Sequence, residues 1–559
     1  MKRILETEKV KFALVCLVCL AAFFVNNHVF TPDIMESRNI ITAREMVYED
    51  HWLVPTMNGE LRLEKPPLPT WLTAVAEMVS PDNIALQRGM AGVAALLLVF
   101  YFWRFARNIL RTDPLVPTLL LCTCYNVILM GRTASWDIYC HAFMMGGIYH
   151  LARALALPPC AWRHFLAAGA LMGLSMLSKG PVSLYALFLP FLMSYGCFYR
   201  PSVKGKGLAL VAMAVVAVVL GTWWYVFLHI AHADALSAVV QKESGSWMNH
   251  NVRPWWYYWK FFLETGVWSL LLLTAIFLPL ADERRRKSRR WLFSLGWMLA
   301  SLLLLSLMPE KKSRYLLPLL LPASYLMGCL MLWWKETLQD RCSVPSADKW
   351  GFRVNAGLIA GVVVVLPLFA WWFVLGPGHV SFGGCAVFSL FAVAIAFYLL
   401  HSAVRLHMRG LLGGVTLLFF VTECLVMPTL GKVINNPDMK SIAEIRGMKR
   451  VEGVPFCHID TVPVRIELVY AARCAIRPVC PDSLRNRLPC VMLTRSPIRE
   501  VLPDSCLTGI ETTYLGRYDD NSRPKTNRRY STDFISYATL LEAKKDTVQV
   551  KNKKDCNDE

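Results

Sequence analysis

The stretch GLALVAMAVVAVVLGTWWYVFLHI, residues 207–230, decides the class of fold. It runs for 24 positions without an Asp, Glu, Lys or Arg. An α-helix rises about 1.5 Å per residue, so a helix of this length spans the roughly 30 Å hydrocarbon core of a bilayer. A helix that is apolar on all sides needs an apolar surrounding on all sides. The stretch therefore predicts a transmembrane helix.

Similar apolar blocks recur along most of the chain. The 559 residues are 55% hydrophobic, and the mean hydropathy is +0.40. We expect an all-α polytopic membrane protein with about 13 transmembrane helices, the first of them retained rather than cleaved as a signal peptide. The thirteen blocks fall near 12–30, 86–106, 114–130, 136–157, 164–177, 182–199, 207–230, 263–281, 291–308, 315–334, 355–375, 382–401 and 410–428.

The net charge of +19 is explained by membrane orientation rather than by nucleic acid. Basic residues concentrate in alternate loops, and the strongest cluster is the run Arg284–Arg290. Loops rich in Lys and Arg stay on the cytoplasmic side. The pattern predicts a cytoplasmic N-terminus, and an odd number of crossings then places the C-terminal tail outside. We expect no nucleic-acid partner.

The tail is predicted to form a separate, small α/β domain over residues 431–545. Residues 454–459 and 490–493 resemble short buried strands, and 438–448 resembles a helix. The last stretch, 546–559, is rich in charge and is expected to be disordered. Disulfides are expected if the tail faces an oxidising compartment, but the sequence leaves their pairing open. The tail cysteines are Cys457, Cys474, Cys480, Cys490, Cys506 and Cys556.

The first predicted outer loop covers residues 31–85. Residues 36–49 predict a helix with one apolar face, suited to lie along the membrane surface. Asn58-Gly59 predicts a turn, and Pro66-Pro67 excludes a helix at that point.

Charged residues of the predicted outer side gather in six short motifs. Charges beside membrane helices are costly and are candidates for function. Because the orientation was derived without these motifs, their common side indicates one composite site. The motifs are TPDIMESR with Asp33, Glu36 and Arg38; EKPPL with Glu64 and Lys65; GRTASWDIY with Arg132 and Asp137; SKGP with Lys179; HNVRPWWYY with His250 and Arg253; and PEKKSRYLLP with Lys311, Lys312, Arg314 and Tyr315.

Carboxylates mixed with cations suit the transfer of a group from a phosphate. Lys and Arg neutralise phosphate charge, and a phosphate leaving group needs charge stabilisation more than it needs a proton. A carboxylate can act as a general base toward an acceptor hydroxyl or can orient a sugar. Each motif also has a structural explanation. Asp33 could cap a helix, Glu64-Lys65 could be a solvated ion pair, Lys179 could extend to the membrane interface, and residues 255–258 could form an aromatic belt.

The first loop, PDIMESRNIITAREMVYEDHWLVPTMNGELRLEKPPL, resembles that of bacterial lipid A aminoarabinose transferases and of the wider protein-mannosyltransferase-like group. The matching features are Glu36 with Arg38, then Arg44-Glu45-Met46, a W-x-V-P step, Asn58-Gly59 and the motif E-K-P-P-L. The other motifs follow in the order of the family, and the resemblance covers about residues 10–430.

The resemblance implies a GT-C fold and inverting transfer of a sugar from a polyprenyl phosphate. The family has an acidic pair at the start of the loop, of which the first acid is catalytic. Aligned through Arg38, the second acid is Glu36, whereas Met35 stands at the first position and Asp33 lies two residues earlier. The identity of the catalytic carboxylate is therefore open between Asp33 and Glu36. Met35 favours an acceptor that is already a phosphate, because a hydroxyl acceptor needs a base.

Carried over residue by residue, the resemblance assigns further roles. Arg38 belongs to the site; Lys65 and Lys179 would hold the donor phosphate or sugar; Arg253, Tyr315 and Lys312 would contact the lipid phosphate. Glu64 and Asp137 would orient the site, with Asp137 grouped among the catalytic residues. No cofactor is certain, and a divalent metal ion held by Glu64 and His250 is left open.

The sequence therefore predicts a multi-pass glycosyltransferase of the bacterial inner membrane. Its donor would be a polyprenyl (undecaprenyl) phosphate sugar, and its acceptor lipid A or a related glycolipid on the periplasmic face. One alternative is a protein O-mannosyltransferase-like enzyme or a ligase of the same fold class, and another is a lipid or sugar transporter or flippase. The absence of a paired repeat and of charges near helix centres disfavours the transporter.

Overall fold

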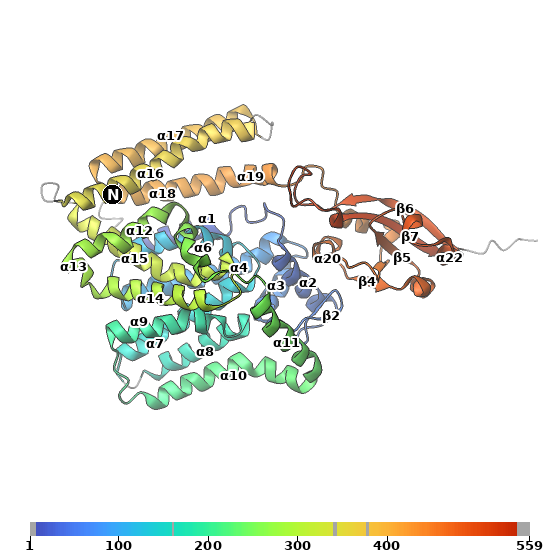
Figure 1. Cartoon of the computed structure of the whole chain (residues 1–559), viewed down its shortest axis with the longest axis horizontal. Coiled ribbons are helices and arrows are strands. Elements are labelled where there is room, and N and C mark those ends of the chain that lie inside the picture. The colour runs from blue at the N-terminus through green and yellow to red at the C-terminus, as the bar shows by residue number, and fades with distance from the viewer. Residues whose placement is uncertain (1–6, 159–160, 339–343, 376–379, 545–559) are drawn as a thin grey trace, which may run out of the picture. The chain divides into compact units, whose positions relative to one another are not determined.

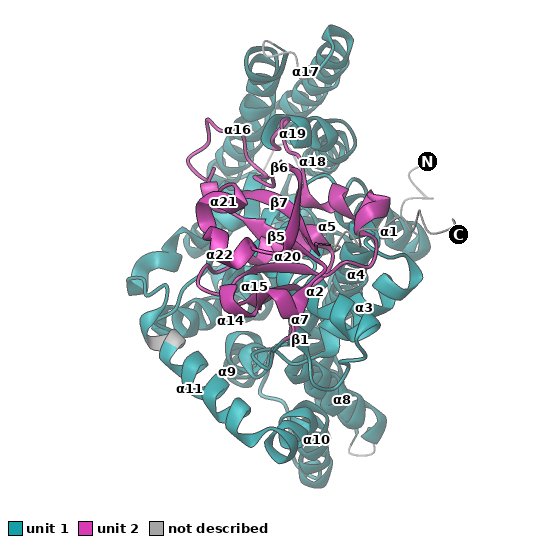
Figure 2. Ribbon diagram, turned by 90° about the vertical axis from the view of Figure 1, so that its right-hand side faces the viewer, with its two compact units in different colours: residues 1–56, 60–434 teal, residues 57–59, 435–559 magenta. Residues whose placement is uncertain are grey.

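The computed structural model describes residues 7–158, 161–338, 344–375 and 380–544. The chain divides into two compact units, shown in separate colours in Figure 2. Unit 1 comprises residues 1–56 and 60–434, and unit 2 comprises residues 57–59 and 435–559. The segment 546–559, predicted to be disordered, and Cys556 lie outside the described residues.

Unit 1 is built almost entirely of helices packed against one another (Figure 1). A 3-10 segment, Trp255–Trp268, leads into α12, and short π-helical turns precede α9 and α19. The longer loop elements aside, the helices are α1 (Glu8–Phe23), α4 (Ile84–Asn108), α5 (Leu115–Cys122), α6 (Tyr125–Gly131), α7 (Trp136–Ala156), α8 (Trp162–Lys179), α9 (Leu189–Tyr199), α10 (Gly207–Ala231), α11 (Ala233–Asn249), α12 (Ser269–Phe277), α13 (Glu283–Arg286), α14 (Arg289–Leu307), α15 (Leu317–Thr337), α16 (Ser346–Ala370), α17 (Phe382–Arg405), α18 (Met408–Val421) and α19 (Met427–Ile434).

The predicted membrane class is confirmed, but the predicted number of crossings is not. Within the described residues, eight helical segments are long and apolar enough to cross a membrane. The predicted block 114–130 is interrupted at Thr123-Cys124, so it forms two short helices, α5 and α6. The eight segments are Ile84–Asn108, Gly207–Ala231, Trp255–Ala281, Arg289–Leu307, Ser313–Thr337, Ser346–Leu375, Phe382–Arg405 and Met408–Ile434.

The first loop forms two helices and a small hairpin. Helix α2 (Ile34–Tyr48) confirms the helix predicted there, and α3 (Leu68–Val79) begins directly after Pro66-Pro67. Between them, β1 (Thr56–Met57) pairs with β2 (Glu60–Leu61). The connecting residues Asn58 and Gly59 have φ of 58° and 80°. Two positive φ values are typical of the tight hairpin turn that Asn-Gly favours, which confirms the predicted turn.

A buried ion pair joins three distant parts of unit 1. Arg132, after α6, contacts the Glu423 carboxylate and donates to the carbonyls of Ala22 at 3.1 Å and Val25 at 2.6 Å. Arg132 is 9% exposed and Glu423 2% exposed. Since a buried charge needs a charged or hydrogen-bonded partner, this pair fixes the end of α1 against the segment that joins α18 to α19.

Unit 2 is a small α/β domain, as predicted. Its sheet has the strand order β4-β3-β5-β7-β6. Strands β3 (Phe456–Ile459) and β5 (Cys490–Thr494) confirm the two predicted strands, and β3 runs parallel to β5 and to β4 (Ile476–Val479). Strands β6 (Ile510–Asp519) and β7 (Ile535–Ala543) continue the sheet in antiparallel pairing. The helix expected over 438–448 is shorter and is a 3-10 helix, Ile442–Gly447, because Asp438–Lys440 form a turn and a bridge to Asp519.

Candidate functional site

Asp33 and Glu36 form a capping box at the start of α2. The Asp33 carboxylate accepts hydrogen bonds from the backbone N–H of Met35 at 2.8 Å and of Glu36 at 2.9 Å. Glu36 accepts in return from the N–H of Asp33 at 3.4 Å. This arrangement satisfies amide groups that a helix start otherwise leaves unpaired. The cap therefore accounts for Asp33, which is exposed.

Glu36 is also bound by an arginine from α4. Arg88 donates from Nε and Nη2 to the two Glu36 oxygens, each at 2.8 Å. The N–H of Ala134 donates to Glu36 Oε1 at 2.9 Å. Both residues are buried, Glu36 with 4% and Arg88 with 3% of their surface exposed. A two-pronged Arg–carboxylate contact is strong and fixes orientation, so Glu36 joins α2, α4 and the segment that leads to Asp137.

Asp137, Lys179 and Tyr315 meet between three helices. Asp137 lies in the first turn of α7, and its carboxylate contacts the Lys179 ammonium at the end of α8. The Lys179 nitrogen lies 5.0 Å from the centre of the Tyr315 ring, within the range of a cation–π contact. Gly180 follows with φ 68° and ψ −156°, a backbone conformation that is essentially restricted to glycine. Gly180 thus allows α8 to end at Lys179.

The fifth and sixth motifs lie against each other. Val252 and Glu310 form a β-bridge, and Lys311 donates to the carbonyl of Arg253 at 3.1 Å. Glu310 contacts the Lys312 ammonium and accepts from the Tyr315 hydroxyl at 3.4 Å. The side chains of His250 and Arg253 are exposed.

The second motif carries an ion-pair cluster with α11. The Lys65 ammonium lies 3.1 Å from Glu243, and the Lys242 ammonium lies 3.5 Å from Glu64. Burial lowers the pKa of Lys65; the negative charge of Glu243 opposes this shift, and the positive charge of Lys179 adds to it. Burial alone would raise the pKa of Glu64, but the Arg62 guanidinium, a backbone hydrogen bond and Lys242 together outweigh it, and the pKa is lowered.

Three buried polar atoms around Arg62 have no hydrogen-bond partner among the described residues: Arg38 Nε, Glu64 Oε2 and Trp136 Nε1. The Arg62 guanidinium lies 5.6 Å from the centre of the Trp136 ring and interacts electrostatically with both Glu64 and Arg38. Buried polar atoms without partners are rare and costly in proteins. Two donors and one acceptor of this kind are suited to a bound anion or a sugar hydroxyl.

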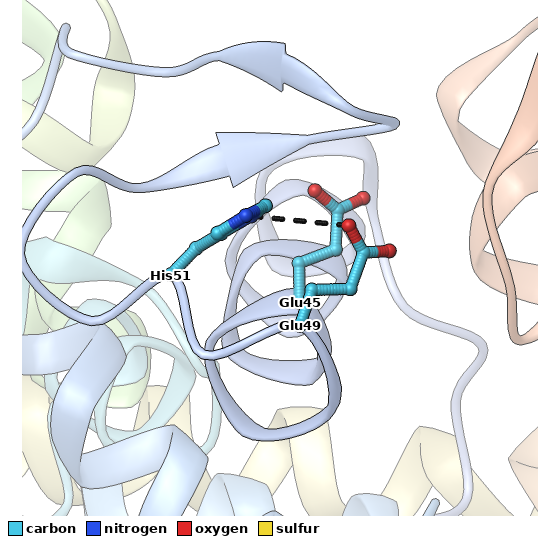
Figure 3. Close-up of side chains that lie close together, drawn as sticks. All are labelled: Glu45, Glu49 and His51. Atoms are coloured by element: carbon cyan, nitrogen blue, oxygen red, sulfur yellow. Dashed lines mark ion pairs between the residues drawn. The ribbon is translucent and has the colours of Figure 1, made fainter.

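One other group of the described residues could hold a metal ion. Glu45, in the last turn of α2, converges with Glu49 and His51, which follow the helix; one ligand atom from each lies within 4.8 Å of the others (Figure 3). The Thr56 hydroxyl lies among them, 2.7 Å from His51 Nδ1 and 2.5 Å from Glu45 Oε2. This group contains neither Glu64 nor His250, the pair left open from the sequence, and a metal at that pair stays a prediction.

Contacts connect five of the six motifs within unit 1, and Arg62, two residues before the second motif, lies 5.6 Å from the ring of Trp136 in the third motif. Glu36 contacts Ala134, Asp137 contacts Lys179, and Lys179 faces Tyr315. The fifth motif joins through the bridge to Glu310. Sequence analysis missed several partners: Arg62, Arg88, Lys242, Glu243 and Glu310. Glu310 and Arg62 stand next to motifs and could have been included, whereas nothing local marks Arg88 or Glu243.

The fold and these contacts define a polytopic membrane protein with one charged site on its helical unit. Residues 64–225 match the family model described as dolichyl-phosphate-mannose-protein mannosyltransferase. An undecaprenyl phosphate-α-4-amino-4-deoxy-L-arabinose arabinosyl transferase of Pseudomonas fluorescens is 26% identical over 355 residues, which cover 60% of each chain. A protein of the same description from Proteus mirabilis is 26% identical over 339 residues, covering 56% of this chain and 58% of that protein. The chain thus matches about three fifths of the length of these relatives.

Solved structures extend the similarity to nearly the whole chain. ArnT from Cupriavidus metallidurans, in a crystal structure bound to undecaprenyl phosphate, superposes with a TM-score of 0.64 at 16% sequence identity. The match covers 95% of this chain and 98% of that one, and the apo structure of the same protein gives 0.61. The GT-C fold implied by the motifs is confirmed, as is the resemblance to the aminoarabinose transferases.

Proposed function

We propose that the chain is an inverting glycosyltransferase that moves a sugar from a polyprenyl phosphate to an envelope acceptor, in the first place lipid A or a related glycolipid. The observation that carries the proposal is the set of contacts that join five of the six charged motifs within unit 1, with Arg62, beside the second motif, against Trp136 of the third. The similarity to aminoarabinosyl transferases supports the class of reaction, and the ArnT structure with undecaprenyl phosphate supports the class of donor.

The donor phosphate would be held by Lys65 and Lys179. Both ammonium groups are largely shielded from solvent, with 24% and 10% of their side chains exposed. Shielded cations interact with phosphate more strongly than solvated ones do. As the bond from the anomeric carbon to the phosphate oxygen breaks, negative charge grows on that oxygen, and fixed cations stabilise it. Tyr315, Lys312 and Arg253 complete the contacts to the lipid phosphate in this proposal.

The sugar would lie against Arg38, Glu64 and Trp136. Their unpartnered atoms offer two donors and one acceptor beside Arg62. Glu64 keeps its charge, since its pKa is lowered, and a carboxylate accepts hydrogen bonds from sugar hydroxyls or from an amino group.

The contacts of Glu36 and Asp137 favour a phosphate acceptor over a hydroxyl acceptor, with the unpartnered oxygen of Glu64 assigned to the donor sugar. Asp33 caps α2, Glu36 accepts from Arg88 and Ala134, and Asp137 contacts Lys179. A hydroxyl acceptor needs a general base with a free lone pair within reach. A phosphate acceptor is ionised at neutral pH, and its oxygen can attack the anomeric carbon directly. In this proposal Glu36 positions the site, and Asp137 orients Lys179.

The membrane setting is proposed as predicted. The chain would be a multi-pass protein of the bacterial inner membrane, with the N-terminus in the cytoplasm and unit 2 in the periplasm. Two observations support it: the alternation of basic loops along the chain and the similarity to enzymes whose donor is an undecaprenyl phosphate sugar.

A transfer assay with the purified chain tests the proposal. The chain is incubated with an undecaprenyl-phosphate-linked aminoarabinose and lipid A, and modified lipid A is measured by mass spectrometry. We expect transfer by the natural chain, a loss of at least about a hundredfold in Lys65→Ala and Lys179→Ala because a shielded charge contact to the leaving group is removed, and full activity in Lys287→Ala. Lys287 is an exposed control whose side chain is 71% accessible.

A deletion strain separates the acceptors. Mass spectrometry of its lipid A and of its envelope glycoproteins identifies which product is lost. Loss of a lipid A substituent supports the proposal. Loss of protein glycosylation instead would point to the protein O-mannosyltransferase-like alternative, and a donor that is translocated without transfer would point to the flippase.

A further inference from the structure

Two adjacent ion pairs link the second motif to helix α11. The chain order is Glu64-Lys65 on the loop and Lys242-Glu243 on the helix. Lys65 contacts Glu243 at 3.1 Å, and Glu64 contacts Lys242 at 3.5 Å. The loop carries an acidic residue followed by a basic one, and the helix carries a basic residue followed by an acidic one. Each residue therefore faces one of opposite charge. This pairing is local to the loop that also carries the unpartnered Glu64 Oε2.

The two pairs differ in their surroundings. The side chain of Lys65 is 24% exposed and that of its partner Glu243 is 34% exposed. Lys242 is 71% exposed, so its contact with Glu64 is largely solvated and contributes little. Lys65 also feels the positive charge of Lys179. The Glu243 carboxylate is thus the counter-ion of Lys65, as Asp137 is of Lys179.

Helix α11 has few other attachments. Its described residues are exposed or half-buried, and none is fully buried. Ala235, Leu236 and Val239 pack against a small apolar cluster formed by Leu63, Leu177, Trp224 and Leu228. A helix held by a short apolar stripe and two partly solvated ion pairs can shift at low cost.

We infer that Glu243 occupies, at Lys65, the place that the phosphate of the donor takes, so that donor binding displaces the second half of α11. The inference rests on the proposed function, since it concerns the phosphate that Lys65 would hold. A phosphate carries more charge than a carboxylate and offers more acceptor oxygens. A second anion beside an occupied Lys65 would be repelled, so the carboxylate and the phosphate compete for this ammonium group.

The competition makes Glu243 a specificity-determining residue rather than a catalytic one. An anion that binds weakly to Lys65 leaves the ion pair between Lys65 and Glu243 intact. A polyprenyl phosphate displaces the Glu243 carboxylate from Lys65. Lys242 moves with Glu243 and releases Glu64 at the same time. The carboxylate of Glu64 then becomes available to the sugar that the phosphate carries.

The test compares Glu243→Gln with Asp234→Asn. Asp234 carries the same charge in the first turn of the same helix and is the matched control. The affinity of the full chain for undecaprenyl phosphate is measured in detergent micelles. We expect Glu243→Gln to bind about two- to fivefold more tightly, in line with the loss of one partly exposed ion pair that competes with the ligand. Asp234→Asn should bind as the natural chain does.

The outcomes separate this inference from the proposed function. Equal or weaker binding by Glu243→Gln, in a chain that transfers sugar, would overturn the inference and leave the function intact. Tighter binding by Glu243→Gln in a chain that transfers no sugar would support the inference and count against the proposed reaction. If neither form binds undecaprenyl phosphate, both are wrong.

Discussion

At the scale of single residues, Glu36 lies where the sequence predicts a catalytic acid, but its contacts are those of a structural residue. Its place in the first motif marks it as a candidate catalytic acid, yet Arg88 holds both of its oxygens and Ala134 donates to one of them. A carboxylate with this many donors is poorly suited to accept a further proton. Its contacts instead determine where α2 and the start of α7 lie relative to α4.

Replacing Glu36 should therefore affect stability as well as activity. Glu36→Gln leaves the Arg88 charge buried without its counter-ion, which typically costs about 3–5 kcal/mol. We expect a clearly lower midpoint of thermal unfolding in detergent. The exposed pair Glu283–Lys287, with side chains 69% and 71% accessible, supplies the control Glu283→Gln, which should unfold as the natural chain does. An inactive Glu36→Gln of unchanged stability would instead make Glu36 a reacting carboxylate.

The pH dependence should report on Lys65. Its pKa lies below the usual range of lysine because the side chain is buried. The phosphate contact needs the protonated amine, so kcat/KM, which reflects the free enzyme, should fall as pH rises through this lowered pKa. An arginine stays protonated over that range. Lys65→Arg should therefore move the alkaline limb to higher pH, whatever its maximal rate, and an unmoved limb would assign it to another group.

At the scale of elements, sequence patterns predicted the helices, turns and strands whose formation depends on neighbouring residues. The helix after Asp33, the turn at Asn58-Gly59 and the strands β3 and β5 follow from capping residues, turn chemistry and apolar runs. The block 114–130 was misjudged as one helix. Its apolar character is continuous, whereas the interruption at Thr123-Cys124 comes from packing: Trp268 donates to the Thr123 hydroxyl at 2.8 Å.

The end of α8 gives a prediction at this scale. Gly180 has φ 68° and ψ −156°, so an alanine there is strained by about 1–3 kcal/mol, although its Cβ would meet the Tyr225 hydroxyl at an ordinary contact distance of 3.6 Å. We expect Gly180→Ala to lose about tenfold or more of the transfer rate, since the strain moves Lys179 away from Asp137. Gly196 in α9 would receive a Cβ with nothing within 4 Å, and Gly196→Ala should keep the rate. Normal transfer by Gly180→Ala would show that the backbone adapts without moving Lys179.

At the scale of the whole molecule, the sequence predicted the fold class, an all-α membrane protein with a small C-terminal α/β part, but not which charged residues pair with one another. Contacts join five of the six motifs in unit 1, and Arg62 lies between the second motif and Trp136 of the third. The partners Arg88 and Glu243 come from distant parts of the chain, and no spacing rule links Glu36 to Arg88 or Lys65 to Glu243. Such pairings depend on how the helices pack, which a single sequence does not specify.

The predicted membrane orientation is testable with fusions. A reporter that is active only in the periplasm is joined after residue 445, within unit 2, and a second after residue 287, within the basic run. We expect activity from the first fusion and none from the second, because basic loops stay in the cytoplasm. The reverse result would contradict the orientation, and activity from both would contradict the number of crossings between them.

The measurement that tests the central claim most directly is photo-crosslinking of the intact chain with a polyprenyl phosphate that carries a photoreactive group beside its phosphate. If the six motifs form one phosphate site, the labelled peptides should include Lys65, Lys179 and the segment 310–316, and excess undecaprenyl phosphate should suppress the labelling. Label confined to the basic run 284–290 or to unit 2 would contradict the account.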